Sequence, residues 1–159
     1  MKSLENMQYS LLGLGDDSYA QYQGNPIFCN DGLVKLSAKA YYPFTKANEN
    51  DGFRETVVAW KDAVVKTVLE ILEGRFEQSH KHHCTILYGS WTGYSTEISE
   101  DLEDQLVDDN YTVERMTLDE YGSWILDSSK QTLYLIICST CGEGNPPDNA
   151  DLFVRWLLT

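Results

Sequence analysis

The chain has 159 residues, 42% hydrophobic and 23% charged, which is enough apolar content for one domain, or two small ones, with a sizeable core. Its 25 acidic and 12 basic residues give a net charge of −13, which argues against nucleic acid or an anionic membrane surface as a partner and favours a basic one. We expect no signal peptide, membrane span or disulfide scaffold, and therefore a reducing, cytoplasmic location.

The first half of the chain is predicted to form two strands and two helices. The strands are expected over residues 8–12, which run into a Gly-rich segment at 13–19, and over residues 40–44, stopped by Pro43. The helices are expected over residues 26–38 and 53–73, the second with apolar residues at spacings of three and four. The apolar residues of these helices are Ile27, Phe28, Leu33, Val34 and Leu36, then Phe53, Val57, Trp60, Val64, Val68 and Ile71.

The second half follows an aperiodic linker, residues 74–83, and again alternates strands with helices. The predicted strands are an apolar run that starts at Cys84 and breaks at Gly89, and residues 111–116 and 133–138; the predicted helices are residues 94–108 and 148–158. Residues 117–130 are irregular, with one helical turn at most. Leu152, Phe153, Trp156 and Leu157 are expected to face inward from the last helix. The alternation implies a doubly wound parallel sheet.

A hydroxyl-rich loop connects the strand ending at Gly89 to the helix beginning near Tyr94. Its hydroxyls belong to Ser90, Thr92, Ser95 and Thr96, and Gly93 leaves backbone N–H groups accessible. Such a helix N-terminus can bind a phosphate. Because no Lys or Arg lies between residues 84 and 96, neutral donors would hold that phosphate. The alternative is an ordinary helix cap, which Ser and Thr also favour.

Three segments resemble the FMN domain of the diflavin reductases. Residues 90–95 (Ser-Trp-Thr-Gly-Tyr-Ser) resemble its phosphate loop, residues 139–150 its second flavin loop and residues 12–19 its third. This family includes the NADPH–cytochrome reductases, methionine synthase reductase and the sulfite reductase flavoprotein. The resemblance implies FMN as the cofactor. It also implies a flavodoxin-like fold, a doubly wound parallel sheet of five strands with helices on both faces.

The order of the three loops differs from that of the family, because the third loop comes first in this chain. We therefore expect one circularly permuted domain, in which residues 1–73 resemble the family's C-terminal half and residues 84–159 its N-terminal half, joined by the linker at 74–83. A cut across two tandem repeats, an engineered chain, and a dimer in which the halves pair between chains remain alternatives.

The resemblance implies the following site. The phosphate is expected at Ser90, Thr92, Gly93, Tyr94 and Ser95, with Trp91 in the same loop. Tyr19 is expected to stack on one face of the flavin ring, flanked by Leu14, Gly15, Asp16 and Tyr22, although it could be an ordinary surface or core tyrosine. The second flavin loop supplies Ser139, Thr140, Cys141, Gly142 and Gly144. Cys141 stands where relatives usually place an aromatic residue, and Gly142 stands where a carbonyl meets the flavin's reducible nitrogen.

The implied function is electron transfer, singly, from an FAD- and NADPH-dependent reductase to an acceptor such as a haem protein. Glu143, Glu49 and Glu55 are expected at the rim that docks the acceptor, or as ordinary surface charges. Nothing resembles an FAD or nicotinamide site, so the chain is not expected to oxidise NADPH alone. The alternatives are a self-contained quinone reductase and a flavin-free interaction domain.

Two patterns could indicate a metal or redox site, but we expect neither. Cys138 and Cys141 have the spacing of a redox or metal pair, and we interpret them as one core thiol and one loop thiol. His80, His82 and His83 lie in the predicted linker, where we expect them to be incidental.

Overall fold

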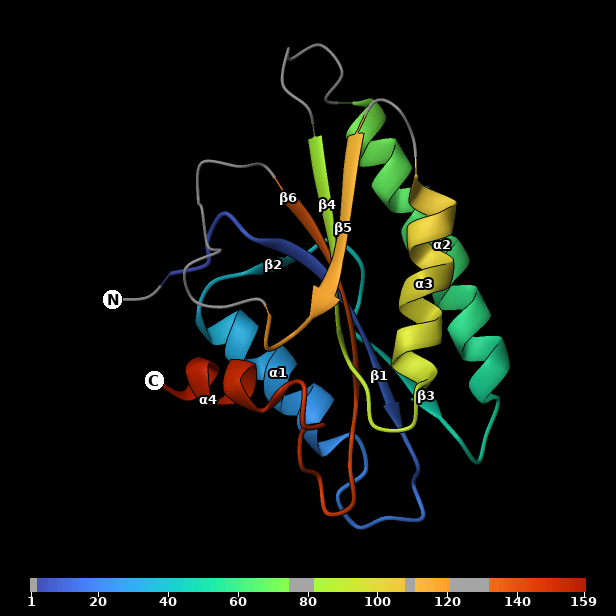
Figure 1. The fold of residues 1–159 in the computed structure, drawn as a ribbon, viewed down its shortest axis with the longest axis vertical. Helices are drawn as coiled ribbons and strands as arrows, with labels where there is room; N and C mark the ends of the chain where they lie inside the picture. The colour runs from blue at the N-terminus through green and yellow to red at the C-terminus, as the bar shows by residue number, and fades with distance from the viewer. Residues whose placement is uncertain (1–2, 75–81, 108–110, 121–131) are drawn as a thin grey trace.

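The computed structural model describes residues 3–74, 82–107, 111–120 and 132–159. These residues form one parallel sheet covered by helices on both faces (Figure 1). Its strands are β1 (Gln8–Gly15), β2 (Lys39–Ala40), β3 (Thr45–Asn48), β4 (His82–Gly89), β5 (Tyr111–Thr117) and β6 (Thr132–Ser139). The helices are α1 (Gly24–Lys35), α2 (Phe53–Glu73), α3 (Tyr94–Leu106) and α4 (Asp151–Leu158). The predicted α/β class and the flavodoxin-like architecture are confirmed.

The strand order is β2-β1-β6-β4-β5, and β3 also pairs with β1. All of these pairs are parallel. If β4, β5, β6, β1 and the edge made by β2 and β3 are counted as strands one to five, the order across the sheet is 2-1-3-4-5. This is a common doubly wound order, with a ligand crevice at the carboxyl ends of the strands where the winding reverses.

The edge strand differs from its prediction. Residues 40–44 are not one strand: β2 pairs with the start of β1, β3 pairs with its end, and residues 41–44 lie between them. Pro43 has no backbone N–H to donate to a ladder, so the edge is interrupted around it. In the described part of the chain the sheet therefore has six strand segments in place of the predicted five strands, although β2 and β3 share one edge position. β1 also continues to Gly15, three residues beyond the predicted end.

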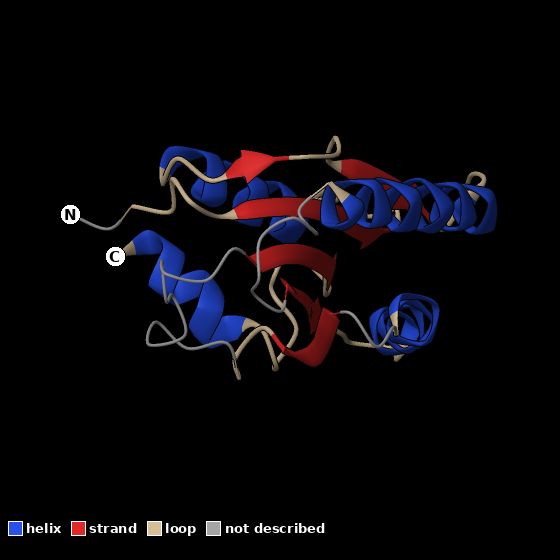
Figure 2. Ribbon diagram, turned by 90° about the horizontal axis from the view of Figure 1, so that it is seen from above, coloured by secondary structure: helices blue, strands red, loops and turns tan. Residues whose placement is uncertain are grey.

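Two clusters of buried apolar residues hold the helices against the two faces of the sheet. One packs α2 and α3 against one face of the sheet, with Trp60 and Leu102 fully buried in it. The other packs α1 and α4 against the opposite face, with Leu33 and Phe153 buried in it. Figure 2 shows the sheet between the two pairs of helices. Because β1 and β6 are covered on both faces, nearly all of their residues are buried, as central parallel strands require.

The predicted helical faces need three corrections. Val34 is 57% exposed and Leu152 is 64% exposed, because α1 and α4 point Leu33 and Phe153 inward and a neighbouring residue lies about 100° away around a helix. In α2 the last buried residue is Leu72, one turn after Val68, while Ile71 is only half-buried. The bounds predicted for α2, 53–73, are confirmed.

The predicted linker is too long at its end, because β4 begins at His82 and pairs with β5 from that residue onward. Residues 75–81, and most of the segment predicted as irregular at 117–130, lie outside the described residues. The start of the described chain, at residue 3, and the C-terminal helix α4 lie on the same side of the molecule in both views (Figures 1 and 2). Leu4 and Leu157 accordingly share one apolar cluster. Within the described ranges, no helix has the length and apolarity to cross a membrane.

Candidate functional site

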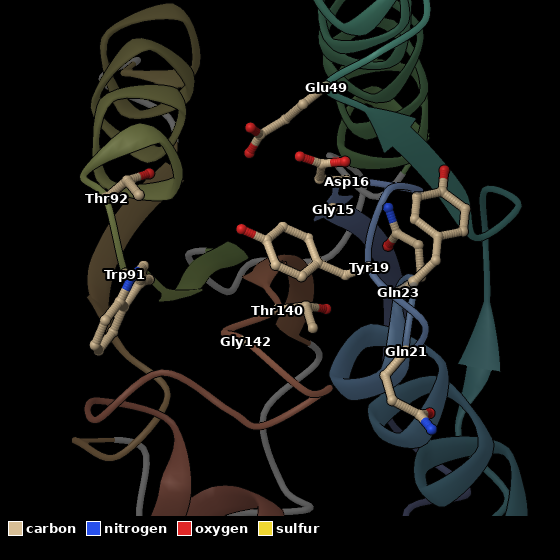
Figure 3. Close-up of a pocket in the computed structure, with 11 residues that line it drawn as sticks. Gly15, Asp16, Tyr19, Gln21, Gln23, Glu49, Trp91, Thr92, Thr140 and Gly142 are labelled. Carbon is tan, nitrogen blue, oxygen red and sulfur yellow. The ribbon is translucent and has the colours of Figure 1, made fainter.

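A pocket of about 200 Å³ opens at the carboxyl ends of β1, β4 and β6 (Figure 3). The loop after β1 contributes most of its wall, the loop after β4 contributes Trp91 and Thr92, and the loop after β6 contributes Thr140 and Gly142. Its described lining is Gly15, Asp16, Tyr19, Gln21, Tyr22, Gln23, Glu49, Trp91, Thr92, Thr140 and Gly142. The three loops singled out in the sequence therefore meet around one cavity, although two of them lie far from the third in the chain.

The wall on the β1 side is held by Gln23, which the sequence analysis missed. Gln23 is fully buried and has a left-handed backbone, with φ 58°. Its Nε2 donates to the carbonyl oxygens of Gly13, at 3.2 Å, and Ala47, at 3.0 Å. The side chain thus ties the end of β1 to the end of β3. The sequence did not identify Gln23, because its role depends on the turn after β1 that brings its side-chain amide to the carbonyl groups of Gly13 and Ala47.

Asp16 and Tyr19 lie in the loop that follows β1. The Asp16 carboxylate accepts hydrogen bonds from the hydroxyl and the backbone N–H of Ser18 and from the Asn50 side chain. These bonds, that of the Ser18 hydroxyl first, hold the pKa of Asp16 below its usual value. Asp16 is therefore charged at neutral pH, at the edge of the pocket. Tyr19 is 58% exposed, and Figure 3 shows its ring projecting into the pocket.

The loop between β4 and α3 leads into a helix end that holds a buried hydroxyl without a described partner. Gly93 is left-handed, with φ 101°, and its N–H donates to the Ser90 Oγ at 3.0 Å. No side chain caps α3, so the interpretation of these hydroxyls as ordinary caps does not describe this helix end. The Ser95 Oγ is buried and has no hydrogen-bond partner in the described part of the chain. Buried hydroxyls without a partner are costly, so a ligand is an obvious candidate partner.

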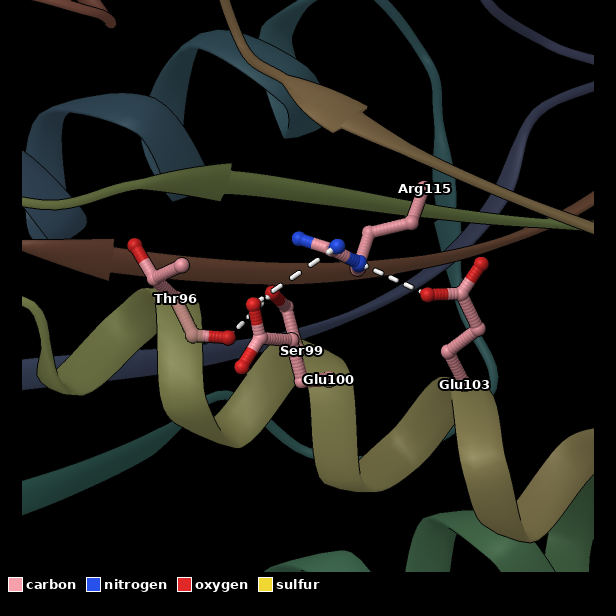
Figure 4. Close-up of polar contacts among 5 residues, drawn as sticks. All are labelled: Thr96, Ser99, Glu100, Glu103 and Arg115. Atoms are coloured by element: carbon pink, nitrogen blue, oxygen red, sulfur yellow. Dashed lines mark hydrogen bonds and ion pairs between the residues drawn. The ribbon is translucent and has the colours of Figure 1, made fainter.

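The rest of α3 is anchored firmly. Arg115 of β5 donates to Glu103 at 2.8 Å and lies 3.7 Å from Glu100, and the Ser99 hydroxyl donates to the Thr96 carbonyl at 2.6 Å (Figure 4). The Ser99 hydroxyl thus has a hydrogen-bond partner, whereas the structure describes none for the Ser95 hydroxyl one turn earlier. The N-terminal end of α3 is therefore the part of this helix where a ligand could satisfy a buried hydroxyl.

The loop after β6 is a tight turn. The backbone groups of Cys141 and Asn145 pair in both directions, at 2.9 and 3.0 Å, around Gly142 and Gly144, which have φ 47° and 91°. The Thr140 N–H donates to the Leu14 carbonyl at 3.1 Å, which joins this turn to β1. The Thr140 Oγ1 is buried, and the structure describes no partner for it.

Some predicted site residues do not reach the pocket with their side chains. Leu14 is buried in the core and contributes its carbonyl, and Tyr94 packs edge-on against Phe53, with ring centroids 5.7 Å apart. Ser139 donates to the Gly89 carbonyl. Glu55 and Glu143 are exposed outside the pocket lining, and only Glu49 of the three predicted docking carboxylates belongs to it. The remaining predicted residues do not line the pocket either: Ser95 lies in the first turn of α3, and the others, Ser90, Gly93, Cys141 and Gly144, lie in the surrounding loops.

Asn149 is a second residue that the sequence analysis did not assign. Its Oδ1 accepts the Ser90 N–H at 3.0 Å, and its carbonyl accepts the Asp119 N–H at 3.0 Å. Asn149 thereby fixes the start of the hydroxyl-rich loop from the segment before α4. Asn149 lies between β6 and α4, 59 residues after Ser90 in the chain, so no sequence pattern indicated this contact.

The two spaced cysteines are both buried. Burial raises the pKa of the Cys141 thiol to about 11, and the nearby Asp148 carboxylate acts in the same direction. The pKa of Cys138 is raised by its hydrogen bond with Cys29 and by burial. All four cysteines are free thiols. The raised pKa values of Cys138 and Cys141 disfavour the thiolate form, which is the reactive form of a cysteine.

We expect Cys141 to resist alkylation. With a pKa of about 11, on the order of one thiol in a thousand is ionised at pH 8, and only the thiolate reacts. Folded protein treated with iodoacetamide at pH 8 should remain unmodified at Cys141 long after an unfolded control is fully labelled, as measured by mass spectrometry. Labelling of both samples at the same rate would contradict the burial and the raised pKa.

Comparisons with known proteins support a flavodoxin assignment. Residues 86–159 match the flavodoxin family model. The chain is 33% identical over 77 residues to NADPH-dependent diflavin oxidoreductase 1 of Danio rerio, a match that covers 48% of this chain and 13% of the relative. It is 36% identical over 75 residues to the sulfite reductase [NADPH] flavoprotein alpha-component of Shewanella oneidensis, covering 47% and 12%. No solved structure matches the chain.

A third relative is named as a different enzyme. The mitochondrial pyruvate dehydrogenase [NADP(+)] of Euglena gracilis is 37% identical over 76 residues, which cover 48% of this chain and 4% of that protein. The chain thus spans about an eighth or less of the length of these relatives. The predicted relationship to the diflavin reductases and the sulfite reductase flavoprotein is confirmed, and these matches do not address the permuted order.

Proposed function

Starting from the premise that this chain carries a flavodoxin domain, we propose that it binds FMN and transfers electrons singly between an FAD- and NADPH-dependent reductase and an acceptor protein. One observation carries the proposal: three loops from the two halves of the chain meet around one pocket at the sheet's switch point. The names of the relatives, a diflavin oxidoreductase and a sulfite reductase flavoprotein, support the same cofactor class.

The phosphate of FMN would lie at the N-terminal end of α3. Its donors would be the hydroxyls of Ser90, Thr92 and Ser95 and the free N–H groups of the first turn, including that of Tyr94, with Gly93 providing the left-handed turn. The unpartnered Ser95 hydroxyl fits this role. None of the described residues that line the pocket is Lys or Arg, so the anion would be held by neutral donors.

The flavin ring would occupy the pocket itself. Tyr19 would stack on one face, and Gly15, Asp16 and Tyr22 would form the wall beside it. Thr140 and Gly142 would contact the ring from the turn after β6, with the Thr140 Oγ1 as an available polar partner. Leu14, Ser139, Cys141 and Gly144 would act by shaping these loops, through the backbone and side-chain hydrogen bonds and the left-handed turn described above.

When bound, FMN would supply redox chemistry in which electrons are taken up and released one at a time. The chain's own contribution is to hold the ring between its loops and to surround it with negative charge. Asp16, which is ionised, and Glu49 lie at the pocket, and both oppose negative charge on a reduced ring. A low reduction potential follows. The net charge of −13 favours an acceptor with a basic face, with Glu49, Glu55 and Glu143 as candidate docking residues.

The arrangement of the chain is part of the proposal. Residues 1–73 and 84–159 would form one permuted domain joined by residues 74–83. The sheet order counted from β4 supports this arrangement, as does the apolar cluster that Leu4, near the start of the described chain, shares with Leu157 of α4. If the halves instead paired between two chains, a size measurement would give a dimer, with each site made from both copies.

The function is tested by reconstituting the electron path. The FMN-loaded chain is mixed with NADPH, an FAD-containing NADPH reductase and cytochrome c, a basic haem protein. We expect rapid haem reduction only when all of these are present, and no NADPH oxidation by the chain alone. Oxidation of NADPH by the chain and a quinone without the reductase would support a quinone reductase. Failure to retain FMN would support a flavin-free interaction domain.

A further inference from the structure

Two large aromatic side chains face the pocket from opposite sides. Tyr19, from the loop after β1, is 58% exposed, and Trp91, from the loop after β4, is 62% exposed. Figure 3 shows Trp91 at the left of the cavity and Tyr19 near its centre, with Thr140 below Tyr19. Large aromatic side chains stabilise a fold by burial, so two that remain exposed at one pocket indicate a surface prepared for a flat, apolar ligand.

Trp91 is poorly suited to the phosphate chemistry of its own loop. The indole has one N–H donor and no charge, whereas the loop offers the hydroxyls of Ser90 and Thr92 and backbone N–H groups for an anion. What the indole adds is a wide π-face. Its place in the pocket lining is therefore explained by contact with a ring and not by contact with a phosphate.

The turn after β6 does not supply a second aromatic wall. Cys141 is 9% exposed, its backbone groups are used in the pair with Asn145, and it is absent from the described lining. Only Thr140 and Gly142 of this turn reach the pocket, and neither has a ring. The described lining holds two further aromatic residues: Tyr22, which comes from the same loop as Tyr19, and Trp91, which comes from the loop after β4.

We propose that Trp91 forms the second aromatic wall of the flavin-ring site, facing Tyr19 across the pocket, in addition to standing in the phosphate loop. This inference rests on the proposed binding of FMN. It makes Trp91 a residue that recognises the ring of the cofactor, so its contribution should be independent of the phosphate. The site would then use one aromatic side chain from each half of the chain.

The test compares two flavins that differ only in the phosphate. FMN and riboflavin are titrated separately into the flavin-free protein, and the quenching of flavin fluorescence gives each dissociation constant. We expect Trp91→Ala to weaken both flavins by the same factor, about tenfold, and Trp91→Phe to restore most of the loss. The matched control, Thr92→Val, removes a proposed phosphate donor from the next residue, so it should weaken FMN and leave riboflavin unchanged.

The outcomes separate this inference from the proposed function. If the wild type binds FMN and Trp91→Ala leaves riboflavin binding unchanged, or leaves FMN binding unchanged where riboflavin binds too weakly to measure, Trp91 is not a wall of the ring site and the function stands. If the wild type binds neither flavin, the proposed function fails and the inference fails with it. Circular dichroism and thermal unfolding of each variant verify the fold, which an exposed side chain is not expected to disturb.

Discussion

Replacing Ser95 with alanine should weaken FMN binding by about ten- to a hundredfold, while leaving the flavin-free protein as stable as before or up to about 1 kcal/mol more stable. The two effects have opposite signs because the Ser95 Oγ is buried without a partner in the described structure. Removing it relieves a desolvation cost in the free protein and deletes the hydrogen bond to the charged phosphate that we propose for the complex. Isothermal titration with FMN and urea unfolding measure the two quantities.

Ser99 provides the matched control, one turn further along α3. It is equally buried, but its hydroxyl donates to the Thr96 carbonyl at 2.6 Å. Ser99→Ala should therefore cost about 0.5 to 1.5 kcal/mol of stability and leave the FMN dissociation constant unchanged. If Ser95→Ala behaved like Ser99→Ala, with lower stability and unchanged FMN affinity, the phosphate would not lie at this helix end.

Replacing Gly144 with alanine should cost about 2 to 4 kcal/mol of stability and lower FMN affinity as well. The backbone of Gly144 has φ 91°, which an L side chain rarely adopts, and an added Cβ would lie 2.9 Å from the Cβ of Gln21. Relief of that contact would move the turn carrying Thr140 and Gly142 away from the loop after β1. Urea unfolding and FMN titration of the variant measure both losses.

Gly74 is the control glycine, at the end of α2. Its φ is −66°, and an added Cβ would meet nothing closer than 3.6 Å. Gly74→Ala should be neutral or stabilising by up to about 1 kcal/mol, with normal FMN binding, because alanine restricts the unfolded chain. Equal stability of the Gly144 and Gly74 variants would show that the turn is not packed as described.

The elements with one dominant local signal were predictable from the sequence. α2 follows its prediction from Phe53 to Glu73, because its apolar residues repeat at helical spacing over five turns. The edge strand was not predictable in the same way. The apolar residues around Pro43 suggest one continuous strand, but the proline has no backbone N–H for the strand ladder, and β2 and β3 form on either side of it. Leu152 was placed inward because a short helix has too few turns to define its buried stripe, and only packing against the sheet selects Phe153 and Leu157.

The site was predictable as a set of loops but not as a set of contacts. Motif resemblance selected the segments around Tyr19, Trp91 and Thr140, and the structure places all three at one pocket. It could not find Gln23 or Asn149, whose amides reach backbone groups that are distant in the chain. Such contacts depend on how the two halves meet, which is a tertiary property and leaves no local pattern.

The central claim is that the loops of both halves build one FMN site, and a visible absorbance spectrum tests it most directly. The purified chain is mixed with excess FMN, passed through a desalting column and measured alongside its circular dichroism. The account predicts a flavin spectrum retained at about one FMN per folded chain. Folded protein that emerges without flavin absorbance would contradict the account and would leave these loops as scaffold without a cofactor.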